Sequence, residues 1–473
     1  MKLFSPKITE GLTYDDVLLK PCRSAIASRK DVDLAVQLMP GIVLNLPIIS
    51  APMDTVTESA MAIALARAGA LGVIHRFNTI EKQAEEVAKV KRTENYFLEN
   101  PLSVEATLPL RKLLDKIKTV NHSSFLVVDK ENRLLGLVSK RDYLLETDLT
   151  KLVKELMTPF EKLVCVNEFI TLEAAREFFQ KHRIEKLPVI DNNRKVKGLI
   201  TAKDVLQSSN SKAIRDSRGR LVTAAAVGVK QDFLERAHAL VAAGCDVLVL
   251  DIAHGHLEIC LQTTAELKKA FPTTPLIVGN IATREGAKDL AKAGADVIKV
   301  GVGPGTACTT RIVTGFGVPQ LTAILDAEKG AGRVPIVADG GIRNSGDMVK
   351  ALGAGASAVM MGGMFAGTDE APGKLTMWNG RKVKLYRGMA SLAAYSDKSS
   401  SEVGDFTAEG VDQAFVPAKG AVSDLLKVWE GGLRSGFSYA GAKNLEQLWQ
   451  NAEFIKITQA GMTESKPHDI ASV

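Results

Sequence analysis

One cysteine of the chain stands in a setting that suits a nucleophile. It lies in residues 301–311, Gly-Val-Gly-Pro-Gly-Thr-Ala-Cys-Thr-Thr-Arg, directly after an apolar run. A lone cysteine is more often a small buried hydrophobic residue. Here, however, the glycines let backbone N–H groups approach an anion and favour a thiolate over a thiol. We therefore predict that Cys308 is a nucleophile. The other four cysteines lack this setting and are predicted to be inert: Cys22, Cys165, Cys245 and Cys260.

Two further glycine turns point to a phosphate group. Residues 339–341 (Asp-Gly-Gly) and 362–363 (Gly-Gly) each follow an apolar run late in the chain. Turns of this kind present backbone N–H groups to anions, and in a β/α barrel the last strands are the usual phosphate position. The sequence therefore predicts a phosphorylated substrate beside Cys308. The alternative for the turns at residues 301–305 is that their glycines only satisfy helix N-termini, as they would in a nucleotide sensor without catalytic activity.

Eight apolar, β-rich runs supply the strands that such turns would follow. Most of them alternate with amphipathic helical stretches, a pattern typical of parallel strands that are buried on both faces. The runs are residues 48–51, 71–74, 221–227, 247–251, 276–280, 297–301, 334–339 and 358–362. Eight such units favour a (β/α)8 TIM barrel of the α/β class over a doubly wound sheet. In that fold the chemistry lies on the loops after the strands.

An internal duplication interrupts this pattern between about residues 93 and 210. Residues 125–142 are similar to residues 187–204, and a Gly, a hydroxyl residue and an Asp recur 62 residues later. The pair resembles a tandem CBS (cystathionine β-synthase, or Bateman) domain, which implies a regulatory purine nucleotide. The residues that would hold it are Ser139, Asp142, Thr201 and Asp204. Capping of the following helix explains each copy equally well. The predicted domains are a barrel over 1–92 and 211–473 and a CBS pair over 93–210.

Composition argues against several other classes of protein. The 473 residues carry a formal net charge of only +6, and no basic cluster alternates with aromatic residues, so we expect no nucleic acid partner. No apolar run approaches about 18 residues, so we expect no membrane span. The five cysteines are scattered and odd in number, which favours a reducing cytoplasm. The seven histidines are too dispersed to predict a metal site.

Four motifs together are similar to the inosine monophosphate dehydrogenase and guanosine monophosphate reductase family. They are residues 301–311, 338–342 (Ala-Asp-Gly-Gly-Ile), 386–389 (Tyr-Arg-Gly-Met) and 51–58 (Ala-Pro-Met-Asp-Thr-Val-Thr-Glu). The resemblance covers essentially the whole chain, including the inserted repeat. It implies that Cys308 attacks C2 of the purine of GMP or IMP, so that a hydride can then move between C2 and a nicotinamide cofactor.

The resemblance also assigns roles to individual positions. Asp339 would bind the ribose. The phosphate would be held by Gly303, Gly305, Gly340, Gly341, Gly362 and Gly363 with Thr306 and Tyr386. The base would lie against Met53, Gly388 and Met389, and the cofactor near Asp251, Asn280 and Lys299. A homotetramer or octamer is implied. A monovalent cation, K+, would be bound by Gly301, Gly303 and Cys308 with Glu464 and Ser465 of a neighbouring subunit, although Lys466 departs from the usual dehydrogenase residue.

The segment from residue 390 to 416 separates the two activities of the family. In the dehydrogenases a long flap supplies an Arg-Tyr pair that activates water, but this segment is short and contains no arginine. Residues 403–410 instead resemble the reductase segment, whose Glu pairs with a Thr to move a proton to ammonia. This maps onto Glu409 and Thr310. We therefore expect an NADPH-dependent GMP reductase. A nucleotide sensor without catalytic activity is disfavoured, because it would have no use for Cys308, Thr310 and Glu409 together.

An IMP dehydrogenase that oxidises IMP to XMP with NAD is the alternative. Residues 251–255, 370–373, 386–389 and 464–468 look more like dehydrogenases, as does the CBS insertion. Glu409 has an equivalent in many dehydrogenases and does not discriminate. The missing Arg-Tyr pair decides for the reductase, because nucleotide binding is common to both enzymes but water activation is not.

Overall fold

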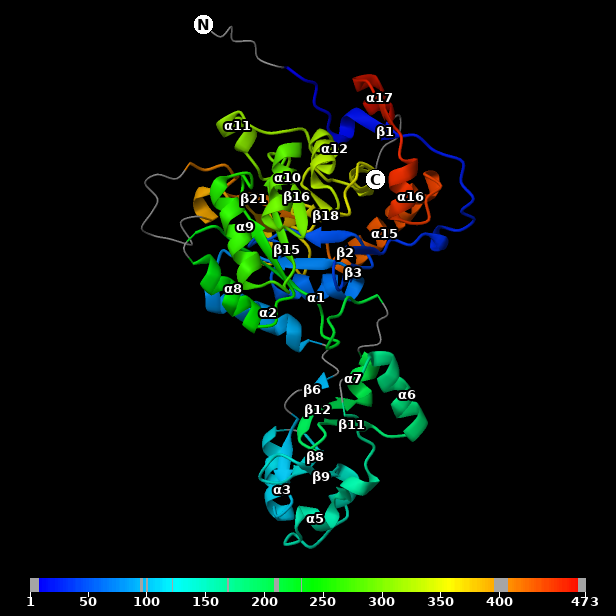
Figure 1. The fold of residues 1–473 in the computed structure, drawn as a ribbon, viewed down its shortest axis with the longest axis vertical. Coiled ribbons are helices and arrows are strands. Elements are labelled where there is room, and N and C mark those ends of the chain that lie inside the picture. The colour runs from blue at the N-terminus through cyan, green and yellow to red at the C-terminus, as the bar shows by residue number, and fades with distance from the viewer. Residues whose placement is uncertain are drawn as a thin grey trace. The chain divides into compact units, whose positions relative to one another are not determined.

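The chain forms two compact units, which the computed structural model describes over residues 8–93, 97–98, 101–120, 122–167, 170–207, 212–230, 232–394 and 407–466 (Figure 1). The larger unit comprises residues 1–91, 212–216 and 221–473, and the smaller one comprises residues 92–211 and 217–220. Each unit has hydrophobic cores of its own. The assignment of the smaller unit as a CBS pair stays a prediction.

The larger unit is built around a closed barrel of eight parallel strands. In the order of their hydrogen bonding the strands are β13 (Ala224–Val227), β14 (Val247–Asp251), β15 (Leu276–Ile281), β16 (Val297–Val300), β17 (Ile336–Asp339), β18 (Ala358–Met361), β4 (Ile48–Ser50) and β5 (Leu71–Ile74). β5 pairs with β13 and closes the barrel. Each strand lies within one of the eight predicted runs or extends it by one residue, so the predicted (β/α)8 fold is confirmed.

Burial on both faces explains why these strands could be predicted from the sequence. Every residue of β4, β5, β13, β16 and β18 is buried. Helices cover the outside of the barrel, because their apolar faces need the same core. They are α1 (Ser59–Ala68), α2 (Ile80–Arg92), α8 (Phe233–Ala242), α9 (Glu258–Ala270), α10 (Arg284–Ala293), α12 (Gln320–Ala331), α13 (Ser345–Gly353), α15 (Val422–Tyr439) and α16 (Leu445–Asn451). Two short helices, α11 (Thr310–Thr314) and α17 (Gln459–Glu464), have no buried residues.

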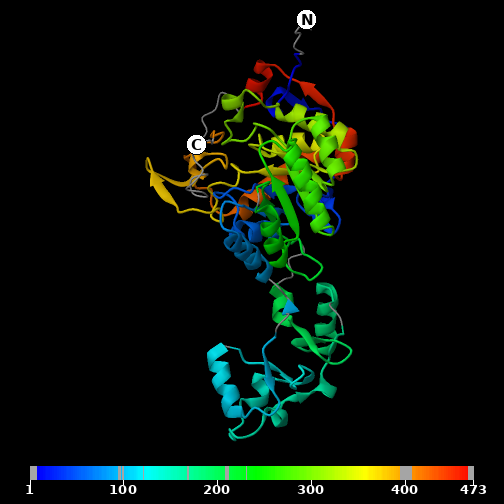
Figure 2. The same cartoon turned by 60° about the vertical axis from the view of Figure 1, so that its left-hand side comes forward.

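Three small antiparallel sheets accompany the barrel. β2 (Val36–Met39) pairs with β3 (Ile42–Leu44), and β1 (Val17–Leu19) pairs with β22 (Phe454–Lys456). The third sheet contains β19 (Thr376–Trp378), β20 (Arg381–Tyr386) and β21 (Ala414–Pro417), and Figure 2 shows its hairpin projecting from the barrel. This sheet matters for the site because β20 ends at Tyr386, and Glu409 lies just before β21. Within the described residues, no helix is long and apolar enough to span a bilayer.

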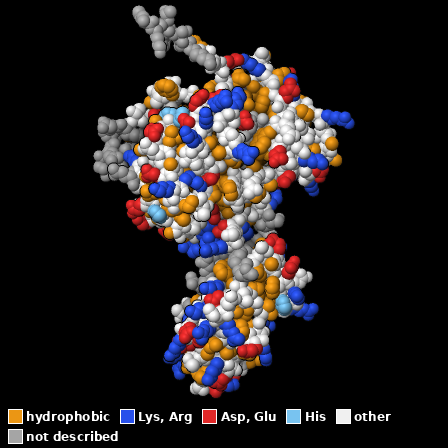
Figure 3. Space-filling model, in the orientation of Figure 1, with side chains coloured by type: hydrophobic (Ala, Val, Ile, Leu, Met, Phe, Trp, Pro, Cys, Tyr) orange, Lys and Arg blue, Asp and Glu red, His pale blue; other side chains and the backbone are white. Residues whose placement is uncertain are grey.

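The smaller unit shows the duplication directly. β8 (Phe125–Val128), β9 (Leu134–Val138) and α4 (Lys140–Tyr143) repeat as β11 (Lys186–Ile190), β12 (Val196–Thr201) and α7 (Ala202–Gln207). The remaining elements are β6 (Phe97–Leu98), β7 (Ser103–Glu105), α3 (Leu110–Val120), α5 (Val153–Leu156), β10 (Thr158–Pro159) and α6 (Leu172–His182). On the visible face of each unit, Figure 3 shows acidic and basic side chains interspersed with apolar ones.

The hydroxyl and carboxylate pairs of the repeat bond to each other at the two strand-to-helix junctions. The Ser139 hydroxyl donates to Asp142 at 2.8 Å, and the Thr201 hydroxyl donates to Asp204 at 2.5 Å. The Ser139 backbone N–H also donates to Asp142, at 2.6 Å, as in a capping box. The structure thus places these residues in the capping arrangement. Their predicted nucleotide role stays a prediction.

Candidate active site

The predicted site residues lie at the carboxyl ends of the barrel strands, which all point to one face of a parallel barrel. Cys308 lies on the loop after β16, Asp339 ends β17, and Gly362 follows β18. Asp251 ends β14 and Asn280 lies near the end of β15. The topology therefore brings these residues together from strands that are far apart in the sequence.

The candidate nucleophile forms a relay with a hydroxyl and a carboxylate. The Cys308 thiol lies 3.2 Å from the Thr310 hydroxyl, which in turn donates to Glu409 Oε2 at 2.8 Å. Backbone contacts hold the two segments together, since the Thr309 N–H donates to the Glu409 carbonyl at 2.8 Å and the Val411 N–H donates to Ala307 at 3.0 Å. The three predicted catalytic residues therefore form one continuous path for a proton.

Three of the other cysteines have properties that disfavour a nucleophile. Burial raises the pKa of the Cys165 and Cys260 thiols to about 11 and that of Cys245 to about 12. Such thiols stay protonated at neutral pH and are poor nucleophiles. Cys22 is exposed, and among the described residues its sulfur contacts only the backbone carbonyls of Lys20 and Asn451.

Two hydroxyl groups converge on the glycine turn after β18. A Cβ at position 362 would lie 3.2 Å from the Tyr386 hydroxyl, and one at position 363 would lie 3.0 Å from the Thr306 hydroxyl. Burial, together with the charge of Asp339, raises the pKa of Tyr386, so the phenol remains a neutral donor. Among the residues described, the N–H groups of Gly363 and Met364 have no protein acceptor. The turn thus gathers N–H and hydroxyl donors, which suit an anion.

The glycine turns after β16 and β17 lie against each other. Gly340 and Gly341 have positive φ angles of 94° and 79°, which side-chain-bearing residues rarely adopt. A Cβ at position 340 would lie 3.2 Å from the Gly305 nitrogen. Gly303 also has a positive φ, 88°, and a Cβ there would clash with Arg311. The predicted phosphate-binding glycines therefore lie in adjoining loops, as the resemblance implies.

A buried ammonium joins the carboxylates at the centre of this face. Lys299, whose side chain is 1% exposed, donates to Asp251 at 2.8 Å and to Asp339 at 2.9 Å. It also contacts Asn280, which donates to Asp339 at 2.9 Å and to the Gly301 carbonyl at 2.8 Å. Burial alone would lower the pKa of Lys299, but the two carboxylates outweigh it and raise the pKa above its usual range.

This cluster of Asp251, Asn280, Lys299 and Asp339 suits ribose hydroxyl groups. Two carboxylates and one ammonium leave a net charge of −1, which accepts hydrogen bonds from hydroxyls and repels phosphate. The carboxylate side chains are 24% and 19% exposed, so each reaches solvent at the barrel mouth. The donor and acceptor set therefore fits the ribose of a nucleotide and the sugar of a nicotinamide cofactor.

Removing this ammonium should destabilise the fold strongly. We expect Lys299→Met to lower the free energy of unfolding by about 3–5 kcal/mol, because it removes a buried cation from between two half-buried carboxylates. Urea unfolding would measure this. Because the pKa of Lys299 is higher in the folded than in the unfolded chain, its contribution to stability is complete at neutral pH and should persist at pH 9. It should disappear only when strongly alkaline pH deprotonates the ammonium.

The exposed pair of Lys20 and Glu453 provides the control: Lys20→Met should cost at most about 1 kcal/mol. A Lys299→Met cost no larger than that of Lys20→Met would contradict the expectation.

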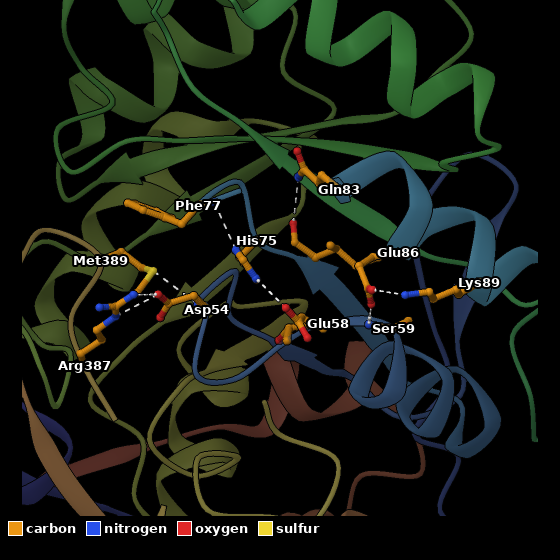
Figure 4. Close-up of polar contacts among 12 residues, drawn as sticks. Asp54, Glu58, Ser59, His75, Phe77, Gln83, Glu86, Lys89, Arg387 and Met389 are labelled. Atoms are coloured by element: carbon orange, nitrogen blue, oxygen red, sulfur yellow. Dashed lines mark hydrogen bonds and ion pairs between the residues drawn. The ribbon is translucent and has the colours of Figure 1, made fainter. Parts of the chain in front are cut away.

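The predicted base-binding residues lie beside an ion pair that the sequence analysis missed. Arg387 donates to Asp54 at 2.9 Å, and the Asp54 N–H lies 3.4 Å from the Met389 sulfur (Figure 4). A Cβ at position 388 would lie 2.7 Å from the Ala307 carbonyl, so only glycine fits between the cysteine loop and its neighbour. A Cβ at position 362 would lie 2.7 Å from the Met53 sulfur. Met53 thus lies next to the glycine turn at residues 362–363, which we call the phosphate turn, and Met389 lies next to Asp54, which follows Met53 in the chain.

The loop after β5 also carries polar residues that the sequence analysis did not select. His75 is buried, its Nδ1 accepts from the Phe77 N–H at 3.1 Å, and its Nε2 lies 3.4 Å from Glu58 (Figure 4). Among the described residues, the Arg76 Nε has no hydrogen-bond partner. Burial lowers the pKa of Arg76, and Asp251 partly offsets this. Their position directly after an apolar run was the signal that could have identified them.

Some predicted residues are not brought to the site within one chain. Glu464 ends α17, and the following Ser465 bonds to the carbonyls of Gly461 and Thr463 in the same helix. The Gly301 carbonyl accepts from Asn280. No group of three or more His, Cys, Asp or Glu residues in the described ranges could hold a metal ion. The predicted cation site therefore stays a prediction, and His468 and residues 395–406 of the predicted flap lie outside the described residues.

Comparison with known proteins places this geometry in context. Residues 11–468 match the family model of the IMP dehydrogenase / GMP reductase domain. The inosine-5′-monophosphate dehydrogenase of Nitrosopumilus maritimus is 50% identical, over 98% of both chains. That of Aquifex aeolicus is 49% identical, over 98% of this chain and 96% of its own.

Solved structures give a second similarity. GMP reductase of Trypanosoma brucei in complex with guanosine 5′-monophosphate superposes with a TM-score of 0.83 at 42% identity, over 98% of this chain and 99% of that one. The same enzyme in complex with guanosine 5′-triphosphate gives a TM-score of 0.72 at 39% identity, over 95% and 98% of the chains.

Proposed function

Because the chain belongs to the IMP dehydrogenase / GMP reductase family of oxidoreductases, we propose that it is a GMP reductase. The reaction would convert GMP to IMP and ammonia with NADPH as the reductant. The observation that carries this proposal is the relay from Cys308 through Thr310 to Glu409, combined with a 390–416 segment that contains no arginine. This relay can protonate a departing amine, whereas that segment offers no guanidine base to activate water.

IMP dehydrogenase is the second candidate, and a specific observation favours it. The relatives that are 45–50% identical over nearly the whole chain are named inosine-5′-monophosphate dehydrogenases. The similarity to the Trypanosoma brucei GMP reductase is slightly lower, at 42%, but it spans 98% of the chain, so the inserted unit is compatible with a reductase. We therefore rank the two functions by the chemistry of the 390–416 segment and not by identity.

The catalytic residues have complementary tasks in the proposed reaction. The Cys308 proton passes through the Thr310 hydroxyl to Glu409, and the sulfur forms a bond to C2 of GMP. The same proton then returns through Thr310 to the 2-amino group, the C2–N bond breaks, and ammonia leaves. The product of this step is a thioimidate on Cys308. When C2 has accepted a hydride, the C2–S bond breaks and IMP forms. The Cys308 thiolate that is released takes up a proton from solvent before the next turnover.

The remaining residues position the reactants. Backbone N–H groups of Gly341, Gly363 and Met364, with the hydroxyls of Thr306 and Tyr386, would hold the 5′-phosphate, whereas the Gly340 N–H donates to the Met360 carbonyl at 3.3 Å. Asp339 would accept from the ribose of GMP and Asp251 from the cofactor ribose, with Lys299 holding both carboxylates in place. When bound, NADPH supplies the hydride that C2 receives. Fixing the three reacting groups in one geometry supplies several kcal/mol of barrier reduction, about 7 or more in well-oriented systems.

Other parts of the proposal rest on the family alone or on the duplication. The repeat in the smaller unit would bind a regulatory purine nucleotide through Ser139, Asp142, Thr201 and Asp204, and the Trypanosoma brucei enzyme has been solved with guanosine 5′-triphosphate. The homotetramer or octamer and the K+ site at Gly301, Gly303 and Cys308 are proposed from the resemblance.

A paired assay tests the proposed reaction. We expect purified protein to consume NADPH when GMP is added, seen as falling absorbance near 340 nm, and to release ammonia in equal amount. With IMP and NAD we expect no comparable rise. Turnover of IMP with NAD, and none of GMP with NADPH, would overturn the reductase assignment in favour of the dehydrogenase.

A further inference from the structure

A lysine outside the predicted site lies behind the phosphate turn. Lys419 follows β21, and its ammonium donates to the carbonyls of Gly363 at 2.7 Å and Met364 at 3.0 Å. The side chain is half-buried. Within the described part of the chain, it forms no ion pair with a carboxylate. A positive charge is therefore fixed on the peptide groups of the turn itself.

The geometry of the peptide links this charge to the ligand side of the turn. A trans peptide directs its C=O and its N–H in opposite directions. The ammonium binds the Gly363 carbonyl, so the N–H of the same peptide, which belongs to Met364, points away from Lys419. Among the described residues that N–H has no acceptor. A cation at the carbonyl end polarises the peptide and strengthens its N–H as a donor, in the way that hydrogen bonds in a chain strengthen one another.

The energetics of Lys419 also call for an anion. Burial lowers the pKa of its ammonium, because desolvation disfavours the charged form. A dianionic phosphate at the Met364 N–H would lie across one peptide from the ammonium and would offset this cost. Carbonyl dipoles alone do not supply a full negative charge.

A second lysine in the same region provides a matched comparison. Lys384 on β20 is buried, and it donates to the carbonyls of Ala371 at 2.7 Å and Asp369 at 3.2 Å. It therefore has the same kind of contacts as Lys419, but on peptides that follow the phosphate turn by several residues. Lys384 should share the structural role of Lys419 without its effect on a ligand at the turn.

We propose that Lys419 is a specificity-determining residue, which makes the turn at Gly363 and Met364 select purine ligands that carry a 5′-phosphate. This inference rests on the proposed function only in so far as a purine 5′-monophosphate binds this site. It holds equally for GMP and for IMP. Lys419 acts through the turn and is a positioning residue, because no reacting atom of the purine needs to touch it.

Calorimetric titration of the full chain with GMP and with guanosine tests the proposal. We expect Lys419→Met to weaken GMP binding about ten-fold, the usual loss for a hydrogen bond to a charged group, and to leave guanosine binding within two-fold. Lys419→Arg keeps the charge and should retain GMP affinity within about three-fold. Lys384→Met should change GMP affinity less than two-fold. In turnover, Lys419→Met should raise the KM for GMP about ten-fold with kcat nearly unchanged, as loss of uniform binding requires.

The possible outcomes separate this inference from the proposed function. If wild-type protein binds neither GMP nor IMP, the proposed function itself is wrong. If it binds GMP and Lys419→Met binds GMP equally well, only the role of Lys419 is refuted. Equal weakening of GMP and guanosine, or an equal effect of Lys384→Met, would show that Lys419 is merely structural. If Lys419→Met does not fold, the Lys419→Arg variant decides. A loss of GMP affinity of more than ten-fold in folded Lys419→Arg would refute a role for the charge, and GMP affinity close to that of the wild type would support it.

Discussion

The Cys308→Ala variant should lose turnover by about four orders of magnitude or more, while it still binds GMP with nearly the original affinity. The reason is that the sulfur forms the only covalent bond between the protein and C2 in the proposed reaction. GMP binding by the phosphate turn, by Asp339 and by the predicted base-binding residues Met53, Gly388 and Met389 does not depend on the sulfur. Turnover is measured as NADPH consumption with enzyme in high concentration, and binding by titration calorimetry.

Cys22→Ala is the matched control for this prediction. Cys22 is exposed, and in the part of the chain that the structure describes its sulfur touches only backbone carbonyls, so this variant should keep full activity. Mass spectrometry of wild-type protein mixed with GMP in the absence of NADPH should find the purine attached at Cys308. Appreciable turnover by Cys308→Ala would refute covalent catalysis and with it the proposed mechanism.

Glu409→Gln should reduce turnover of GMP by about 100- to 10,000-fold, the usual contribution of general acid–base catalysis. Glutamine keeps the size of the side chain and can still accept from Thr310, but it cannot carry the proton to the amino group. GMP affinity should change little, because Glu409 lies behind Thr310 and not against the phosphate or the ribose. The measurement is kcat at saturating GMP.

The relay also predicts how two substitutions combine. Thr310→Val should cost a similar factor, and the double variant should be little slower than either single variant, because the three residues act as one path. Asp412→Asn is the control, since Asp412 lies three residues further on and accepts from the Ala393 N–H at 2.9 Å. Full additivity of the two relay substitutions, or a fast Glu409→Gln variant, would contradict the proton path.

The barrel was predictable because its strands are buried on both faces. A parallel strand such as β5 or β18 is apolar at every position and is followed by a glycine or a polar residue. Each strand can therefore be predicted without knowing which strands it pairs with. The run at residues 221–227 was predicted too long: its first residue pairs with Arg215 in an isolated bridge, and the strand begins at Ala224. Strand ends depend on such local contacts, which no periodicity reports.

Tertiary contacts that cross long stretches of chain were not predictable. Arg387 meets Asp54 across 333 residues, and Lys419 meets Gly363 across 56, with no periodic pattern to reveal either pair. Cys308 was selected from its glycine-rich setting and Glu409 from the family resemblance. That the thiol, the Thr310 hydroxyl and the carboxylate form a relay became evident only from the distances between them. In the repeat, the hydroxyl and carboxylate pairs bond to each other, a contact compatible with capping and with the predicted nucleotide role alike.

The way the barrel closes has a consequence for its synthesis. β4 pairs with β18, which the ribosome adds about 300 residues later. At usual translation rates of about 5–20 residues per second, β4 spends about 15–60 s with one edge unpaired. β5 likewise waits for β13 until the whole smaller unit has been made. The first two strands of this enzyme are therefore exposed to aggregation while the chain is nascent, and chaperone binding to that stage should be strongest before residue 358 emerges.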